Sequence, residues 1–335
     1  MLRSPSLVVP GALLALALTG AVAPPRHGNS TGSNRGAEPR IRIWKIHYRA
    51  NNGARRNAFV VLPSWYGPHN HPPIPLVISP HGRGLSARAN AKLWRTFPAI
   101  GRFAVVNPEG QGRRLSLYSW GYKGQIDDLA KMPEDVGRAL PWLHIERHRV
   151  FAVGSSMGGQ ETLLLLARHP RLLAGAAAFD SVADLARQYR DFPLLGCDSN
   201  CLRRWRDPRG LGLQGLMRYE VGGSPETTPE AYASRSPLAY VRRIALSCVP
   251  LEIWWSTADR VVLDQREQSG ELFSEIRRLK PRAPVLQVVG HWTHSAELRE
   301  GPRLRRALRY LGLLRPSYGP ERRIVYGPDR LRPCV

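Results

Sequence analysis

The sequence predicts an α/β fold with a mostly parallel central sheet flanked by helices. Short apolar strands alternate with helical segments from residue 41 onward. Several strands, such as 76–79 and 150–153, are continuous apolar runs, which is typical of strands that are covered on both faces. The 335 residues, of which 43% are hydrophobic, suffice for one large domain with an ordinary core.

The predicted elements follow one another in a regular order. Residues 41–50 alternate apolar and polar side chains and, with 57–62, predict a β-hairpin around Asn51-Asn52-Gly53. The pattern then predicts strands at 76–79, 103–106, 150–153, 172–179, 251–255 and 285–289, and helices at 87–100, 125–143, 157–169, 265–279 and 295–311.

Residues 181–245 do not follow this alternation. They include the sequence CDSNC, a run of glycine and leucine, and EVGGSPETTPEAYASRSP. We interpret this stretch as a cap-like insertion over the edge of the sheet.

The first forty residues have a different composition. A basic start and an apolar run from Leu7 to Leu18 precede Ala21-Val22-Ala23, which predicts a signal peptide over 1–23 with cleavage after Ala23. Residues 24–40 are rich in proline, glycine, serine and asparagine and predict a flexible leader before a domain at 41–335. The apolar run is short for a membrane anchor, so we expect a secreted, extracellular protein.

Four cysteines follow the predicted cleavage site, and export permits disulfides. Of the three pairings, we favour Cys197–Cys201 together with Cys248–Cys334, with a buried free thiol at Cys248 as the alternative. The chain has no C-x-x-C pair and no histidine at ligand spacing, so the sequence does not indicate a zinc site.

The formal net charge is +23 and arises mainly from arginine. A basic protein can associate with polyanions, so we expect loose association with an anionic cell-wall surface. The arginines are scattered and no nucleic-acid-binding motif accompanies them, so we expect no specific nucleic-acid partner.

Gly154-Ser155-Ser156-Met157-Gly158 fits the pattern G-x-S-x-G between a predicted strand and a predicted helix. A nucleophile on a sharp turn comes close to neighbouring backbone, and small residues two positions before and after it relieve the clash. Ser156 occupies the middle position and is therefore the predicted nucleophile.

With this motif in this context, the chain resembles the α/β-hydrolase family, in particular secreted bacterial serine esterases and prolyl-oligopeptidase-like hydrolases, over roughly residues 41–312. The resemblance implies the α/β-hydrolase fold and the chain order serine, acid, histidine. Asp259 follows the strand 251–255 and matches the acid, and Asp180, at the end of the preceding strand, is the alternative.

The predicted base lies in the sequence GHWTHS, which offers His291 and His294. We favour His294 because a loop position reaches back to the serine more easily than the position directly after the strand. The histidine that is not the base is expected to be a hydrogen-bonded structural residue.

Two backbone N–H groups are expected to form the oxyanion hole. The N–H of Met157 follows directly from the turn. The second donor is expected in His81-Gly82-Arg83-Gly84, which is similar to the family's HG-x-G motif, with Arg83 as the first choice and Gly82 as the second.

Tyr118 and Trp120 lie in a loop at the same edge, where they either line a substrate pocket or pack. The sequence has no metal constellation, P-loop or dinucleotide fingerprint, so we expect no metal and no cofactor.

These features predict a secreted serine hydrolase that cleaves carboxylic esters through an acyl-enzyme on Ser156. The expected partner is a small ester or a short peptide. The first alternative is a prolyl-oligopeptidase-type serine peptidase acting on peptides. The second is a non-catalytic secreted binding protein on a hydrolase fold, which would have a missing or misplaced member of the triad.

Overall fold

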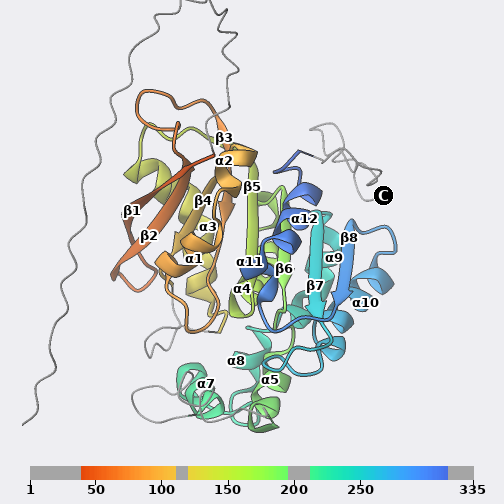
Figure 1. Ribbon diagram of the computed structural model, residues 1–335. Coiled ribbons are helices and arrows are strands. Elements are labelled where there is room, and N and C mark those ends of the chain that lie inside the picture. The colour runs from red at the N-terminus through yellow and green to blue at the C-terminus, as the bar shows by residue number, and fades with distance from the viewer. Residues whose placement is uncertain (1–38, 111–119, 195–211, 316–335) are drawn as a thin grey trace, which may run out of the picture. The chain divides into compact units, whose positions relative to one another are not determined.

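An eight-stranded sheet forms the centre of the computed structural model, which describes residues 39–110, 120–194 and 212–315 (Figure 1). The strand order is β1-β2-β4-β3-β5-β6-β7-β8. The pairs β1–β2 and β2–β4 are antiparallel, whereas the remaining neighbours are parallel. The strands are β1 (Ile41–Arg49), β2 (Arg55–Pro63), β3 (Ile74–Ile78), β4 (Ala104–Pro108), β5 (Ile145–Ser155), β6 (Gly175–Phe179), β7 (Leu251–Ser256) and β8 (Val285–Gly290). The predicted fold class is confirmed.

The helices connect successive strands and cover the sheet. They are α1 (Ala87–Leu93), α2 (Phe97–Gly101), α3 (Lys123–Ala139), α4 (Met157–Arg168), α5 (Leu185–Asp191), α7 (Leu213–Val221), α8 (Pro229–Ala233), α9 (Val241–Ser247), α10 (Ser269–Leu279), α11 (Ala296–Glu300) and α12 (Pro302–Tyr310). Short 3₁₀ turns lie at Pro170–Leu172 (η1), Phe192–Leu194 (η2), Pro237–Tyr240 (η3) and Gln265–Glu267 (η4).

Several sequence-based boundaries were wrong: α3 ends at Ala139 rather than at residue 143, and β5 begins at Ile145 rather than at residue 150. Three further differences have a clear local cause. The predicted helix 87–100 is divided into α1 and α2, because Arg95 has a positive φ and Pro98 can occupy only the first turn of a new helix. The predicted helix 295–311 is divided at Gly301, which has a φ of 85° and precedes Pro302. Strand β6 begins at Gly175 rather than Leu172, because η1 occupies the segment before it.

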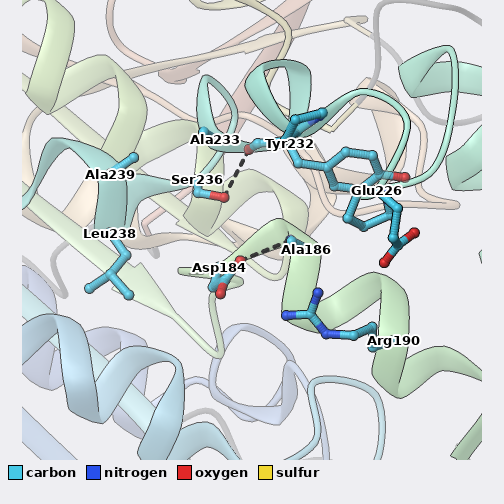
Figure 2. A pocket seen from close by; sticks show the side chains of 11 residues that line it. Asp184, Ala186, Arg190, Glu226, Tyr232, Ala233, Ser236, Leu238 and Ala239 are labelled. Carbon is cyan, nitrogen blue, oxygen red and sulfur yellow. Dashed lines mark hydrogen bonds between the residues drawn. The ribbon is translucent and has the colours of Figure 1, made fainter.

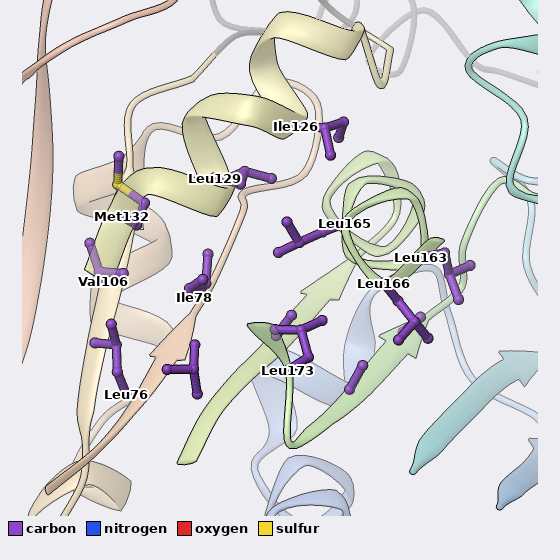
Figure 3. Close-up of a cluster of buried hydrophobic side chains, with 14 of the residues drawn as sticks. Leu76, Ile78, Val106, Ile126, Leu129, Met132, Leu163, Leu165, Leu166 and Leu173 are labelled. Atoms are coloured by element: carbon purple, nitrogen blue, oxygen red, sulfur yellow. The ribbon is translucent and has the colours of Figure 1, made fainter. Parts of the chain in front are cut away.

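The two faces of the sheet bury separate apolar clusters. In β3, Leu76 and Ile78 face a cluster that includes Leu129 of α3 and Leu163 of α4, whereas Val77 faces the opposite cluster. Figure 3 shows α3 and α4 placing their apolar side chains over the first of these faces. Burial on both faces explains why the central strands are continuously apolar in sequence.

The described part of the insertion 181–245 is helical. Its helices α5, α7 and α8 gather beyond the lower ends of the strands in Figure 1. These are the carboxyl ends of β5, β6 and β7, where ligands bind in sheets of this type.

Several predictions fall on residues that the structure does not describe. The predicted signal peptide at 1–23 and residues 24–38 of the leader lie outside the described residues, as do Cys197, Cys201 and Cys334. Cys248 is described and is disulfide-bonded, while the pairing of the four cysteines stays a prediction. Within the described ranges, we find no helix that is both long enough and apolar enough to span a membrane.

Candidate active site

Ser156 lies on a sharp turn between β5 and α4. Its backbone has φ 59° and ψ −126°, a conformation that a residue with a side chain rarely adopts and that costs roughly 1–3 kcal/mol. The Ser156 N–H donates to the carbonyl of Phe179 at 2.8 Å, and the Ser156 carbonyl accepts from the N–H of Gln160 at 3.0 Å. These bonds hold the strained turn from both sides.

The glycines on either side of Ser156 are required by close contacts. A Cβ at Gly154 would lie 2.3 Å from the carbonyl oxygen of Gly158. A Cβ at Gly158 would lie 2.2 Å from the carbonyl oxygen of Pro80, at the start of the loop that carries Gly82 and Arg83. The steric reason given for the G-x-S-x-G motif therefore applies at both positions.

Asp259 and His294 form a hydrogen-bonded pair. Nδ1 of His294 lies 2.8 Å from Oδ2 of Asp259, and their side chains are 13% and 1% exposed. The other carboxylate oxygen, Oδ1, accepts from the backbone N–H groups of Val261 and Val262. Oδ2 also accepts from the side-chain amide of Gln265 at 3.1 Å. These backbone and amide donors therefore fix the orientation of the carboxylate toward the imidazole ring.

This pairing changes the acid–base properties of both groups. Burial alone would lower the pKa of His294, but the charge and the hydrogen bond of Asp259 outweigh burial and raise that pKa above 6.5. Burial would raise the pKa of Asp259, but His294 and the surrounding donors lower it below 3.8. Because Nδ1 is engaged by the carboxylate, Nε2 is the ring nitrogen that remains to take up a proton.

Asp180 lies close to this pair but has different hydrogen-bond partners. Its Oδ1 accepts from the N–H of Ser256 at 3.1 Å, and its Oδ2 accepts from the indole of Trp292 and the N–H of Ser295. It is fully buried, and its negative charge also raises the pKa of His294. Asp180 thus holds the loop that carries His294, while Asp259 makes the direct bond to the ring.

His291 lies elsewhere on the same loop. It is exposed, and its Nδ1 lies 3.2 Å from the hydroxyl of Thr257. Of the two histidines that the sequence offered, the structure brings His294 to Asp259.

The loop after β3 packs against the turn at Ser156. A Cβ at Gly82 would lie 3.6 Å from Cβ of Ser156. The N–H of Leu85 donates to the carbonyl of Gly82 at 3.2 Å, and Gly84 has a φ of 81°. A positive φ at the third residue is what a type II turn requires. The N–H of Met157, the first residue of α4, has no acceptor within its own helix. Both predicted oxyanion segments thus adjoin the serine.

An apolar cluster connects the turn at Ser156 to the insertion. Trp120 is 3% exposed and belongs to this cluster together with Met157. The other buried members come mainly from the insertion and from the loop after Asp259: Val182, Leu185, Tyr189, Phe192, Met217, Val221, Tyr232 and Val262. Trp120 therefore packs in the same apolar cluster as Met157. Tyr118 lies outside the described residues.

A pocket of about 560 Å³ opens on the insertion between α5 and α8 (Figure 2). Its charged lining residues are Asp184, Arg190 and Glu226. Asp184 caps α5 by accepting from the N–H groups of Ala186 and Arg187. Ser156 and His294 are not among the described residues that line it, so we do not treat it as the active site.

Asp180, Asp259 and His294 form the one described group whose spacing could hold a metal ion, with ligand atoms within 4.8 Å of one another. N–H groups already donate to both carboxylates, and Nδ1 of the ring is bonded to Asp259. Because both carboxylates and Nδ1 of the ring are already engaged in these hydrogen bonds, the cluster fits an acid–base pair better than a metal centre.

Comparisons with known proteins identify the fold. No family model matches the sequence, and no curated protein matches it. The S-formylglutathione hydrolase of Staphylococcus aureus is similar in structure, with 16% identity, a TM-score of 0.60 and coverage of 81% of this chain and 99% of that one. The acylaminoacyl peptidase of Pyrococcus horikoshii is also similar, with 16% identity and a TM-score of 0.58. A puromycin-hydrolyzing peptidase of Mycobacterium tuberculosis has 18% identity and a TM-score of 0.59.

The coverage differs between these structures. The alignment to the Pyrococcus peptidase covers 82% of this chain but 41% of that chain, and the alignment to the Mycobacterium peptidase covers 38% of that chain. At these identities the likeness concerns the fold. The chain therefore has the α/β-hydrolase fold.

Proposed function

We propose that this protein is a serine hydrolase that cleaves carboxylic esters through an acyl-enzyme on Ser156. The observation that carries the proposal is the buried Asp259–His294 bond at 2.8 Å, at the same sheet edge as the strained turn at Ser156. A second contact supports it. The hydroxyl of Ser155 donates to the hydroxyl of Ser295 at 2.7 Å, so the residues next to Ser156 and His294 are in direct contact.

In the proposed reaction, Oγ of Ser156 attacks the ester carbonyl carbon while Nε2 of His294 takes the hydroxyl proton. Asp259 holds the ring through Nδ1 and stabilises the imidazolium ion. The tetrahedral oxyanion accepts hydrogen bonds from the N–H groups of Met157 and Arg83, with Gly82 as the alternative second donor.

The carbon–oxygen bond to the leaving group then breaks. The departing alcohol takes the proton from Nε2, and the acyl group remains on Oγ of Ser156. Water next attacks the acyl carbon and gives a proton to Nε2. Release of the carboxylic acid returns that proton to Ser156, and the enzyme is restored.

The alternative substrate is a peptide bond, and the neighbours' names include both activities: a hydrolase of S-formylglutathione and peptidases. Turnover of p-nitrophenyl acetate and butyrate should be compared with turnover of peptide p-nitroanilides. The ester proposal predicts the higher kcat/KM for the acyl esters. A higher kcat/KM for the anilides would favour the peptidase, and no turnover of either class would favour a non-catalytic binding protein.

We also propose that the protein is exported after cleavage at Ala23, as the basic and apolar start of the sequence indicates. Mass spectrometry of the protein recovered from the culture medium should give a mature chain that begins at Pro24. A cell-associated chain that retains Met1 would contradict export.

A further inference from the structure

The side chain of Arg83 leaves the oxyanion loop and enters the insertion. Its Nη1 lies 2.8 Å from both carboxylate oxygens of Glu220, which belongs to α7. The side chains of Arg83 and Glu220 are 7% and 0% exposed, so this ion pair is buried. A hydrogen bond between two charged groups in a buried setting is stronger and more directional than one on the surface.

A second contact fixes the same arginine. The guanidinium carbon of Arg83 lies 5.3 Å from the centre of the Trp120 ring. Trp120 packs in the apolar cluster that also contains Met157 of the turn and Met217 and Val221 of α7. Helix α7 is therefore linked to both predicted oxyanion donors, to Arg83 by the ion pair and to Met157 through the apolar cluster to which both belong.

The geometry points to a role for the insertion in assembling the oxyanion hole, an inference that rests on the proposed function. We infer that Glu220 is a positioning residue, which acts by holding the Arg83 side chain and thereby the direction of the backbone N–H groups in the turn 82–85. Gly82 and Gly84 on either side of Arg83 restrict their own backbone little. An anchor on the Arg83 side chain therefore supplies orientation that the loop's own sequence does not.

The first test is Glu220→Gln, which keeps the shape of the side chain and removes its charge. Loss of a whole oxyanion donor typically costs about 100- to 1000-fold in rate. Because the loop would be loosened rather than removed, we expect kcat for p-nitrophenyl acetate to fall by about 10- to 100-fold, with KM changed less than about threefold.

An alkylboronic acid provides an independent readout of the oxyanion hole. It adds to Ser156 as a tetrahedral anion, so its affinity reports on the same donors. For Glu220→Gln we expect its affinity to fall by about the same factor as kcat/KM. A role confined to fold stability would lower the melting temperature and leave the affinity and kcat of the folded protein unchanged.

Glu220→Asp covers the case in which the glutamine variant does not fold. Aspartate keeps a charged partner for Arg83, but it is shorter by one methylene group and would draw the arginine by about 1 Å, a misplacement that can cost about 100-fold. We expect this variant to fold and to lose at least about tenfold in kcat.

Glu275→Gln is the matched control, since Glu275 pairs with Arg278 on the exposed side of α10, and it should keep kcat within about twofold. A folded Glu220→Asp protein with kcat within about threefold of the wild type would overturn the inference. An inactive wild type, in contrast, would contradict the proposed function itself.

Discussion

Gly158→Ala should test whether activity depends on the close packing of the oxyanion loop against the turn at Ser156. The new Cβ would lie 2.2 Å from the carbonyl oxygen of Pro80 and 3.1 Å from the carbonyl carbon of His81. Both contacts are backbone, and ordinary contact begins at 3.4 Å, so the loop must move by about 1 Å. A displacement of this size can cost about 100-fold in rate. Overpacking of this kind also costs typically about 1–3 kcal/mol of stability.

The assay is kcat for p-nitrophenyl acetate together with urea denaturation. Gly137→Ala is the control, because no described atom lies within 4 Å of its added Cβ and it lies within α3. Alanine favours a helix over glycine by up to about 1 kcal/mol, so the control should be active and at least as stable as the wild type. A folded Gly158→Ala protein with wild-type kcat would refute the argument, since the loop carrying Arg83 would then not depend on its contact with the turn.

Three further predictions concern the histidine and the two carboxylates. His294→Ala should lower kcat for p-nitrophenyl butyrate by about 10⁶-fold. His291→Ala should keep kcat within about threefold, and equal losses in the two variants would contradict the assignment. The pH profile of kcat/KM should rise with pH through a pKa above 6.5, because the neutral ring of His294 is the base. Asp180→Asn should shift this rise to lower pH, because the variant removes a negative charge that stabilises the imidazolium. An unchanged pH profile would mean that Asp180 only holds the loop. Because the folded state raises the pKa of His294, the charged ring contributes stability below pH 6.5 that is lost as pH rises through the folded-state pKa. The free energy of unfolding from urea denaturation should therefore fall across that range in the wild type and fall less in His294→Ala. The same pH dependence of this free energy in both proteins would contradict the pairing with Asp259.

The sequence was most informative where chemistry imposes a local pattern. The glycines around Ser156 form a short local motif that could be recognised without a structure. The contact that requires Gly154 is local, with the carbonyl oxygen of Gly158 at 2.3 Å, whereas the contact that requires Gly158 is with the distant Pro80 at 2.2 Å. The order of serine, acid and histidine narrowed the acid to two aspartates at strand ends. The sequence favoured Asp259 over Asp180, and the structure pairs Asp259 with His294. The role of Asp180 could not be predicted, because it depends on the donors that the fold brings to its carboxylate.

Contacts between distant segments left no such pattern. Glu220 lies 137 positions from Arg83, in an insertion without regular periodicity, so nothing local marked it as the partner of the oxyanion loop. Gln265 bonds Asp259 from only six positions away, but an isolated glutamine is not a recognisable signal. The divided helices were different, because Pro98 and the pair Gly301-Pro302 were visible in the sequence and indicate helix boundaries.

The most direct test of the central claim is labelling with a fluorescent fluorophosphonate, on the wild type and on Ser156→Ala, with turnover of p-nitrophenyl acetate measured in parallel. An activated serine displaces fluoride and retains the label, whereas an ordinary serine hydroxyl does not react. We predict that the wild type is labelled at Ser156 and turns over the ester, and that the folded Ser156→Ala protein does neither. Labelling or turnover that persists in Ser156→Ala, or a folded wild type that neither labels nor turns over, would contradict the assignment of Ser156 as the nucleophile.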